Sequence, residues 1–132
     1  MIPAAIPSSM ERYTITLGSN DAEKTRLVRE ALEWLGTRVR ILRATAPYIT
    51  PDSTGRTALD YANIVAEAET LLQEDELDRL CKSYEQAAGR TRESDTVLID
   101  IDIVCHNGAV LRQADYVSPH FRTGLHLLSS SR

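Results

Sequence analysis

The sequence contains few cysteines, lysines and aromatic residues, and no long apolar run. Its 132 residues include two cysteines and 5% aromatic side chains, and only Lys24 and Lys82 of the fifteen basic residues are lysines. Two isolated cysteines exclude a disulfide framework and a Cys-x-x-Cys site. No apolar stretch approaches the ~20 residues of a transmembrane helix. A chain of this size therefore folds as one domain around a single core.

The charge balance is slightly acidic. Nineteen acidic against fifteen basic residues give a formal net charge of −4, without the basic surface that nucleic acid requires. The excess of arginine over lysine suits binding of phosphate or carboxylate groups, but GC-rich coding bias explains it equally well. The first nine residues lack the basic and apolar regions of a signal peptide. We therefore expect a cytoplasmic protein.

Hydrophobic periodicity predicts the secondary structure. Alternating apolar and polar residues predict strands over residues 12–17, 38–46, 60–70 and 96–105. Apolar residues at helical spacing predict helices over residues 20–36 and 74–89, the first opened by an approximate capping box of Asn20 and Glu23. Alanines leave a helix possible over residues 60–70. Gly18 is expected to end the first strand.

The order of these elements predicts an α+β fold. A β-α-β-β-α-β order is that of the ferredoxin-like βαββαβ sandwich, an antiparallel sheet with two helices on one face. The opposite face is expected to be free, and function must be argued from that face and the loops. We expect a flexible tail over residues 1–11, one domain over residues 12–128 and a frayed end over residues 129–132.

The strongest local signal for chemistry is the run Ile99-Asp100-Ile101-Asp102-Ile103. A period of two sends the isoleucines to the core and both aspartates to the opposite face, roughly 6.5 to 7 Å apart. Two parallel carboxylates repel unless a cation lies between them, and oxygen-only ligands favour Mg²⁺ shared with phosphates. The alternative is a solvated polar face at a sheet edge.

Two further pairs of residues are candidates for binding. Arg90 and Arg92 follow the second helix, where they could reach a polyphosphate, although Arg90 could equally cap the helix C-terminus. Tyr61 and Asn63 share a strand face and offer an aromatic surface and an amide to a flat heterocycle. The alternative is a surface tyrosine beside a turn-stabilising asparagine. The segment Leu17-Gly18-Ser19-Asn20 is only a weak candidate for an anion cradle.

Taken in order, the motifs resemble one family, the 6-hydroxymethyl-7,8-dihydropterin pyrophosphokinases of folate biosynthesis. The resemblance spans about residues 13–128, and the family's ferredoxin-like fold agrees with the order of elements above. It rests on Leu17-Gly18-Ser19-Asn20, Tyr48 to Pro51, Asp60-Tyr61-Ala62-Asn63, Glu85, Gly89-Arg90-Thr91-Arg92, Ile99-Asp100-Ile101-Asp102-Ile103 and Pro119-His120.

The resemblance implies Mg²⁺-dependent transfer of the β,γ-pyrophosphoryl group of ATP to the pterin hydroxymethyl group, leaving AMP. Two Mg²⁺ ions would be held by Asp100 and Asp102, and Arg90 and Arg92 would contact the phosphates during catalysis. Partners would be small molecules only, with no nucleic acid and no membrane, and the protein would be a monomer or weak homodimer. The resemblance places Glu85, Arg90, His120 and Arg122 near the nucleotide, and Thr50, Pro51, Tyr61 and Asn63 in the pterin pocket.

The chain also departs from the family pattern. The segment between Arg92 and Asp100 is shorter than the family's mobile loop, with Val97 where a basic residue is expected. Asp115 occupies a position that is often arginine. Such a loop normally excludes water and contacts phosphates during the chemical step. Two alternatives therefore stay open: a weakly active or inactive relative that binds a nucleotide or heterocycle, and a ferredoxin-like interaction module.

Overall fold

The protein forms one antiparallel sheet flanked by helices. The computed structural model describes residues 10–52, 55, 58–89 and 96–130. Its strands are β1 (Glu11–Ser19), β2 (Arg40–Ala44), β3 (Tyr48–Pro51), β4 (Asp60–Thr70), β5 (Asp100–His106) and β6 (Ala109–Val110), and its helices are α1 (Lys24–Gly36), α2 (Glu74–Ala87), α3 (Gln113–Tyr116) and α4 (Pro119–Ser130). The sheet order is β2-β4-β1-β5-β6, with β3 also paired to β4. Every pairing is antiparallel.

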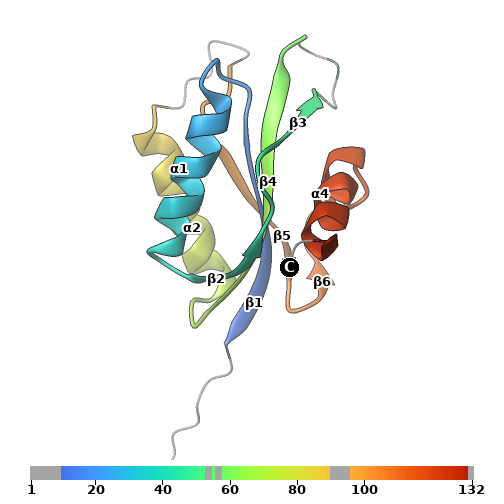
Figure 1. Ribbon diagram of the computed structural model, residues 1–132. Coiled ribbons are helices and arrows are strands. Elements are labelled where there is room, and N and C mark those ends of the chain that lie inside the picture. Colours follow the sequence, from blue (N-terminus) through green and yellow to red (C-terminus); the bar gives the residue numbers. More distant parts are fainter. Residues whose placement is uncertain (1–9, 53–54, 56–57, 90–95, 131–132) are drawn as a thin grey trace, which may run out of the picture.

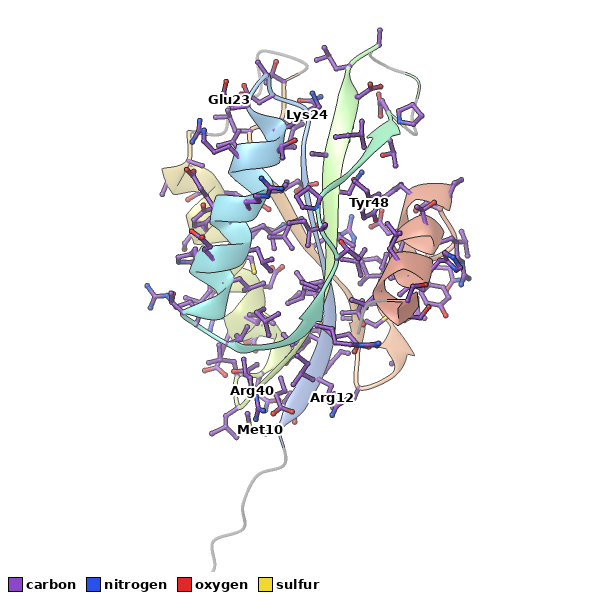
Figure 2. The ribbon with its side chains drawn as sticks, viewed as in Figure 1. Met10, Arg12, Glu23, Lys24, Arg40 and Tyr48 are labelled. Atoms are coloured by element: carbon purple, nitrogen blue, oxygen red, sulfur yellow. The ribbon has the colours of Figure 1, made fainter. Side chains whose placement is uncertain are left out.

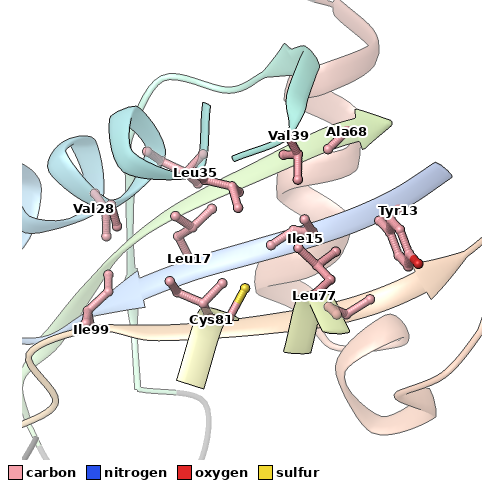
Figure 3. Packing of buried hydrophobic residues seen from close by; sticks show 14 of the residues in the cluster. Tyr13, Ile15, Leu17, Val28, Leu35, Val39, Ala68, Leu77, Cys81 and Ile99 are labelled. Carbon is pink, nitrogen blue, oxygen red and sulfur yellow. The ribbon is translucent and has the colours of Figure 1, made fainter. Parts of the chain in front are cut away.

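Helices α1 and α2 cover one face of the sheet (Figure 1), which confirms the α+β arrangement with two helices on one face. The main core lies between these helices and the sheet. There Ile15 and Leu17 of β1 pack with Val28 and Leu35 of α1 and Leu77 of α2, all fully buried (Figure 3). Burial of alternate strand residues against the apolar face of each helix stabilises this layer. None of the described helices is long and apolar enough to span a bilayer.

The expectation that the opposite face is free is wrong. Helix α4 packs on it, on the far side of the sheet from α1 and α2 (Figure 1). Phe121 and Leu128 of α4 form a second buried cluster with Val65 of β4 and Val104 of β5. Val65 and Val104 lie on the strand face turned away from the main core, and apolar residues there need a cover. The segment from Pro119, for which periodicity predicted no element, is therefore helical and continues to Ser130.

Two local expectations near the end of β1 also differ from the structure. Gly18 does not end the strand but pairs with Asn63 of β4 and Asp100 of β5. Asn20 does not cap α1, which begins at Lys24. Its backbone N–H donates to Val97 O at 3.1 Å and its side-chain Oδ1 accepts from Val97 N–H. Asn20 therefore ties the end of β1 to the segment that precedes β5.

The other end of β5 carries a histidine between two glutamates. His106 Nε2 lies 2.7 Å from Glu11 Oε1 and Nδ1 lies 3.1 Å from Glu74 Oε1, and the ring stacks on Tyr13 at 4.4 Å. Burial alone would lower the pKa of His106, but the hydrogen bonds to both glutamates raise it above its ordinary value. The His106 ring thus joins β1, β5 and α2.

This cluster predicts a pH dependence of stability. A folded pKa above the unfolded value of about 6.5 gives stability that is present below that pH and lost as pH rises through the folded pKa. We expect His106→Gln to lower Tm by roughly 2 to 4 °C near pH 6, corresponding to about 1 kcal/mol. Thermal unfolding should show this difference shrinking towards pH 9, and a difference independent of pH would contradict the assignment.

Candidate active site

A cavity of about 160 Å³ opens on the α4 face of the sheet. Strands β1, β4 and β5 form its floor, β3 forms one wall, and α4 contributes from the other side. The residues that the sequence predicted for the site and that line this cavity are Thr50, Pro51, Tyr61, Asn63, Asp100, Asp102 and His120. Segments distant in the sequence therefore place both the aspartate pair and the tyrosine-asparagine pair in one hollow.

The register of the strands explains why these residues meet. Gly18 lies opposite Asn63 on one side and Asp100 on the other, so the three residues form one row across the sheet. A Cβ at Gly18 would lie 3.7 Å from Tyr61 Cδ2 and 3.9 Å from Asn63 Oδ1. Because Gly18 has no side chain, the floor of the cavity stays open between the Asn63 amide and the Asp100 carboxylate.

Asn63 is held firmly and directs one polar group. It is 8% exposed, and its Nδ2 donates to Tyr48 O at 3.2 Å and to Thr50 Oγ1 at 2.8 Å. Both amide hydrogens are thus used to bind β3, the neighbouring strand. What Asn63 presents to a ligand is its carbonyl oxygen, which accepts a hydrogen bond from an N–H group.

Asp100 and Asp102 lie on the same face of β5, as alternation predicts, while Ile99, Ile101 and Ile103 are buried in the core. Burial and the neighbouring Asp100 raise the pKa of Asp102 to about 6, against the opposing effects of Arg112 and Lys82. Two neighbouring carboxylates on one strand face repel each other, so ionisation of both is unfavourable without a cation.

The donor set of this pair fits Mg²⁺. No group of three or more His, Cys, Asp and Glu residues forms a metal site within the described ranges. Mg²⁺, however, is commonly bound by one or two carboxylates while phosphate oxygens and water complete its coordination. Asp100 and Asp102 are thus suited to a metal shared with a phosphorylated ligand.

Tyr48 and His120 join the cavity to α4. Tyr48 Oη donates to the backbone oxygen of His120 at 2.9 Å, and Figure 2 shows Tyr48 between the sheet and α4. Burial raises the pKa of Tyr48 above its usual range, so the phenol stays protonated and keeps donating. Burial lowers the pKa of His120, with Asp115 opposing. A neutral imidazole therefore faces the cavity at neutral pH.

Other predicted residues lie elsewhere. Glu85 is 1% exposed on α2 and its Oε2 accepts from the backbone N–H of Ile101 at 2.7 Å. Arg122 lies over the ring of Tyr116, 4.5 Å from its centroid. Neither side chain lines the cavity. Arg90 and Arg92, predicted to contact phosphate, lie outside the described residues.

Sequence reasoning missed several contributors. Thr16 and Asp52 also line the cavity, and neither belongs to a motif named from the sequence. Tyr48 and Asp115 line it too; both were named from the sequence, but neither was given a role at the site. Lys82 is a further contributor, because its Nζ lies 3.5 Å from Asp102 Oδ1. Burial alone would lower the pKa of Lys82, but Asp102 and Glu85 raise it above its ordinary value. The i, i+3 spacing of Lys82 and Glu85 was the available signal.

Arg112 approaches the aspartates from the segment before α3. Its Nη1 lies 3.8 Å from Asp102 Oδ1, and its Nε forms a short hydrogen bond with Asp115. Two cations therefore lie near the same oxygen of Asp102: Lys82 of α2 and Arg112, which precedes α3.

Comparison with known proteins adds two findings. Residues 14–126 match the family described as 7,8-dihydro-6-hydroxymethylpterin-pyrophosphokinase. A curated protein of Methylorubrum extorquens, named 2-amino-4-hydroxy-6-hydroxymethyldihydropteridine pyrophosphokinase, is 34% identical over 116 residues, which cover 84% of this chain and 73% of that protein. The matched region includes β1 from Thr14 onwards, all the other strands of the sheet and all the residues that line the cavity.

Proposed function

Because the chain belongs to the 7,8-dihydro-6-hydroxymethylpterin-pyrophosphokinase family of enzymes, we propose that it transfers the β,γ-pyrophosphoryl group of ATP to the hydroxymethyl group of a reduced pterin and releases AMP. This is a step of folate biosynthesis. The observation that carries the proposal is the convergence of Asn63, Tyr61, Asp100 and Asp102 on one cavity. The proposed site for the heterocycle and the proposed site for a metal-bound polyphosphate would thus lie side by side.

The pterin is proposed to bind at the β3 and β4 side of the cavity. Asn63 Oδ1 would accept a hydrogen bond from a ring N–H, while Thr50 and Tyr48 O hold its amide in place. Tyr61 and Pro51 would contact the flat faces of the ring. A buried amide that must be paired gives specificity for a ligand with a matching donor, because an unmatched ligand leaves it unsatisfied.

The phosphates are proposed to bind at the β5 side. Asp100 and Asp102 would hold two Mg²⁺ ions together with the triphosphate, and bound Mg²⁺ supplies neutralisation of the phosphate charge. Tight positioning of the hydroxymethyl oxygen against the β-phosphate would then provide most of the rate acceleration. Arg90 and Arg92 are proposed to contact the phosphates.

The nucleotide is proposed to reach from the phosphates along the cavity towards α4. His120 faces the cavity with a neutral imidazole, and Glu85 and Arg122 are the other proposed nucleotide residues. We further propose a cytoplasmic monomer or weak homodimer with small-molecule partners and no nucleic acid, in keeping with its net charge of −4.

The test is AMP release from ATP in the presence of 6-hydroxymethyl-7,8-dihydropterin and Mg²⁺. We expect AMP to appear only when both the pterin and Mg²⁺ are present, with no ADP. Omission of pterin controls for hydrolysis, and EDTA controls for the metal. Protein that binds both ligands by calorimetry and yet makes no AMP would refute the catalytic proposal.

A prediction for the pterin side concerns Asn63. We expect Asn63→Leu to raise the KM for the pterin by about 10- to 100-fold, because the side-chain acceptor is lost, while the KM for ATP changes little. Initial rates at varied pterin and fixed ATP measure this. Thr50→Val is a graded control, since it removes only one hydrogen bond of the Asn63 amide. Equal increases in both KM values would argue against a pterin site here.

One observation favours a second candidate, a relative that binds its ligands without pyrophosphoryl transfer. Among the described residues that line the cavity none is a lysine or an arginine, and Asp115 adds a carboxylate to it. Calorimetry with Mg·ATP distinguishes the two functions when it is paired with the AMP assay. Heat that EDTA abolishes, without AMP release, would identify the binding-only protein.

A further inference from the structure

The outer edge of β5 is held by side chains of α2. Strand β6 pairs with β5 only at Cys105 and His106, so the backbone of Ile101 lies at the outer edge of the described sheet. Its N–H donates to Glu85 Oε2 at 2.7 Å and its carbonyl oxygen accepts from Lys82 Nζ at 3.0 Å. Two side chains, one turn apart on α2, thus satisfy both backbone groups of this residue.

The same two side chains are paired with each other. Lys82 Nζ lies 3.2 Å from Glu85 Oε2, and the Glu85 side chain is only 2% exposed. A nearly buried carboxylate that bonds both an ammonium and an amide is costly to move, because its hydrogen bonds offset the cost of burying the charge. Lys82 and Glu85 therefore form a rigid clamp on the peptide groups of Ile101.

Ile101 is the residue between the two aspartates of the proposed metal site, so the clamp sets the backbone from which both carboxylates project. Lys82 also acts on one of them directly, since its Nζ lies 3.5 Å from Asp102 Oδ1. A positive charge at this distance offsets part of the repulsion between Asp100 and Asp102. The same charge repels any divalent cation that approaches the pair.

We propose that Lys82 is a positioning residue and internal counter-cation of the Asp100–Asp102 pair, which keeps the affinity of the pair for a divalent metal low until phosphate oxygens contribute to the metal's coordination. This inference rests on the proposed function only in taking the aspartate pair as the metal site. It makes metal binding dependent on the nucleotide, so that the metal enters with the triphosphate.

The test is Mn²⁺ binding without nucleotide, measured from the electron paramagnetic resonance signal of free Mn²⁺. We expect Lys82→Met, which keeps the aliphatic stem, to bind Mn²⁺ about 10-fold more tightly than the wild type. Lys82→Arg should stay within about 3-fold of the wild type, because it keeps the charge. Lys24→Met is the matched control, since it removes the chain's other lysine, at the start of α1 (Figure 2), and should change nothing.

A second variant and a second measurement separate the charge from the clamp. Lys82→Gln keeps a donor for the Ile101 carbonyl but loses the charge, and it too should bind Mn²⁺ more tightly. The Tm of both uncharged variants should be lower than that of the wild type without metal, and Mg²⁺ should raise their Tm by more than it raises that of the wild type. A merely structural lysine would lower Tm equally with and without Mg²⁺, which would overturn the proposal.

Failure of this inference is distinguishable from failure of the proposed function. If AMP forms and Asp102→Asn loses Mn²⁺, but the uncharged Lys82 variants bind Mn²⁺ as the wild type does, the inference is wrong and the function stands. If the variants gain affinity through Asp102 and no AMP forms, the inference stands without the catalytic step. Wild-type and variant proteins that bind no Mn²⁺ through Asp102 would overturn the inference.

Discussion

Replacement of Asp102 by asparagine is expected to lower the rate of AMP formation by about 10³-fold or more. Asp102 is one of only two carboxylates on the cavity face of β5, and loss of a metal-binding charge removes several kcal/mol of stabilisation from the transition state. The substitution is nearly isosteric and removes one of two adjacent negative charges. The Tm should therefore stay the same or rise, so lost activity would not reflect unfolding. Steady-state AMP release and thermal unfolding of the same preparation measure both effects.

The matched control is Asp78→Asn, an exposed aspartate on α2 that does not line the cavity. It changes the net charge by the same amount and should leave the rate within about 2-fold of the wild type, as surface substitutions usually do. If Asp102→Asn retains most of its activity, the aspartate pair is not the metal site and the proposed phosphate side of the cavity is wrong.

Gly124→Ala is expected to destabilise the protein by roughly 2 to 3 kcal/mol, a fall in Tm of about 10 °C. Gly124 is buried in α4, and a Cβ there would overlap with Tyr48 Oη and Val65 Cγ2. Alanine normally stabilises a helix relative to glycine, so destabilisation would show that close contact between α4 and the sheet decides the outcome. Differential scanning calorimetry measures the change.

Gly36→Ala is the control for this prediction. Gly36 is the last residue of α1, and a Cβ there would lie 3.7 Å from Ile41 Cγ1, an ordinary contact. We expect this variant to be neutral or slightly more stable, through its better helix propensity. A Tm for Gly124→Ala equal to that for Gly36→Ala would mean that α4 does not pack against the sheet as described.

The overlap caused by Gly124→Ala is also expected to affect the site. Tyr48 Oη, with which the new methyl group would overlap, holds the backbone of His120. Movement of Tyr48 would therefore shift a residue that lines the cavity from α4 and the wall that β3 provides. We expect the remaining folded Gly124→Ala protein to have weaker ligand binding as well as a lower Tm.

Much of the fold could be predicted from periodicity. The alternation in Ile99 to Ile103 placed the isoleucines in the core and both aspartates on the opposite face, as the structure confirms. The strand over residues 60–70 is confirmed with the same bounds, against the helix that its alanines left possible. The period-two signal is strong where one face of a strand is buried and the other carries polar residues, as from Asp100 to Ile103 in β5.

Helix α4 could not be predicted in the same way. Its apolar positions share the segment with Gly124 and a run of polar residues, so its periodicity is weak, and its existence depends on the need of Val65 and Val104 for a cover. The expectation that Gly18 ends the first strand was wrong because it also ignored contacts with other strands. Glycine usually weakens a strand, but here its neighbours on both sides pair with it across the sheet.

Some residues of the site could be predicted from the sequence, and others could not. Motifs along the chain indicated Asn63, Asp100 and Asp102, because their chemistry is evident from spacing. The roles of Lys82 and Arg112 depend on tertiary contacts with Asp102, which the i, i+3 spacing of Lys82 and Glu85 alone does not reveal. Of the chain's arginines, those best suited to the phosphates by motif, Arg90 and Arg92, stay predictions.

The most direct test of the account is to identify the product formed from ATP and 6-hydroxymethyl-7,8-dihydropterin by mass spectrometry and ³¹P nuclear magnetic resonance. The proposed reaction yields a pterin that carries a diphosphate, formed in equal amount to AMP and only with Mg²⁺. A pterin monophosphate with ADP, or unchanged pterin with intact ATP under conditions where both ligands bind, would contradict it.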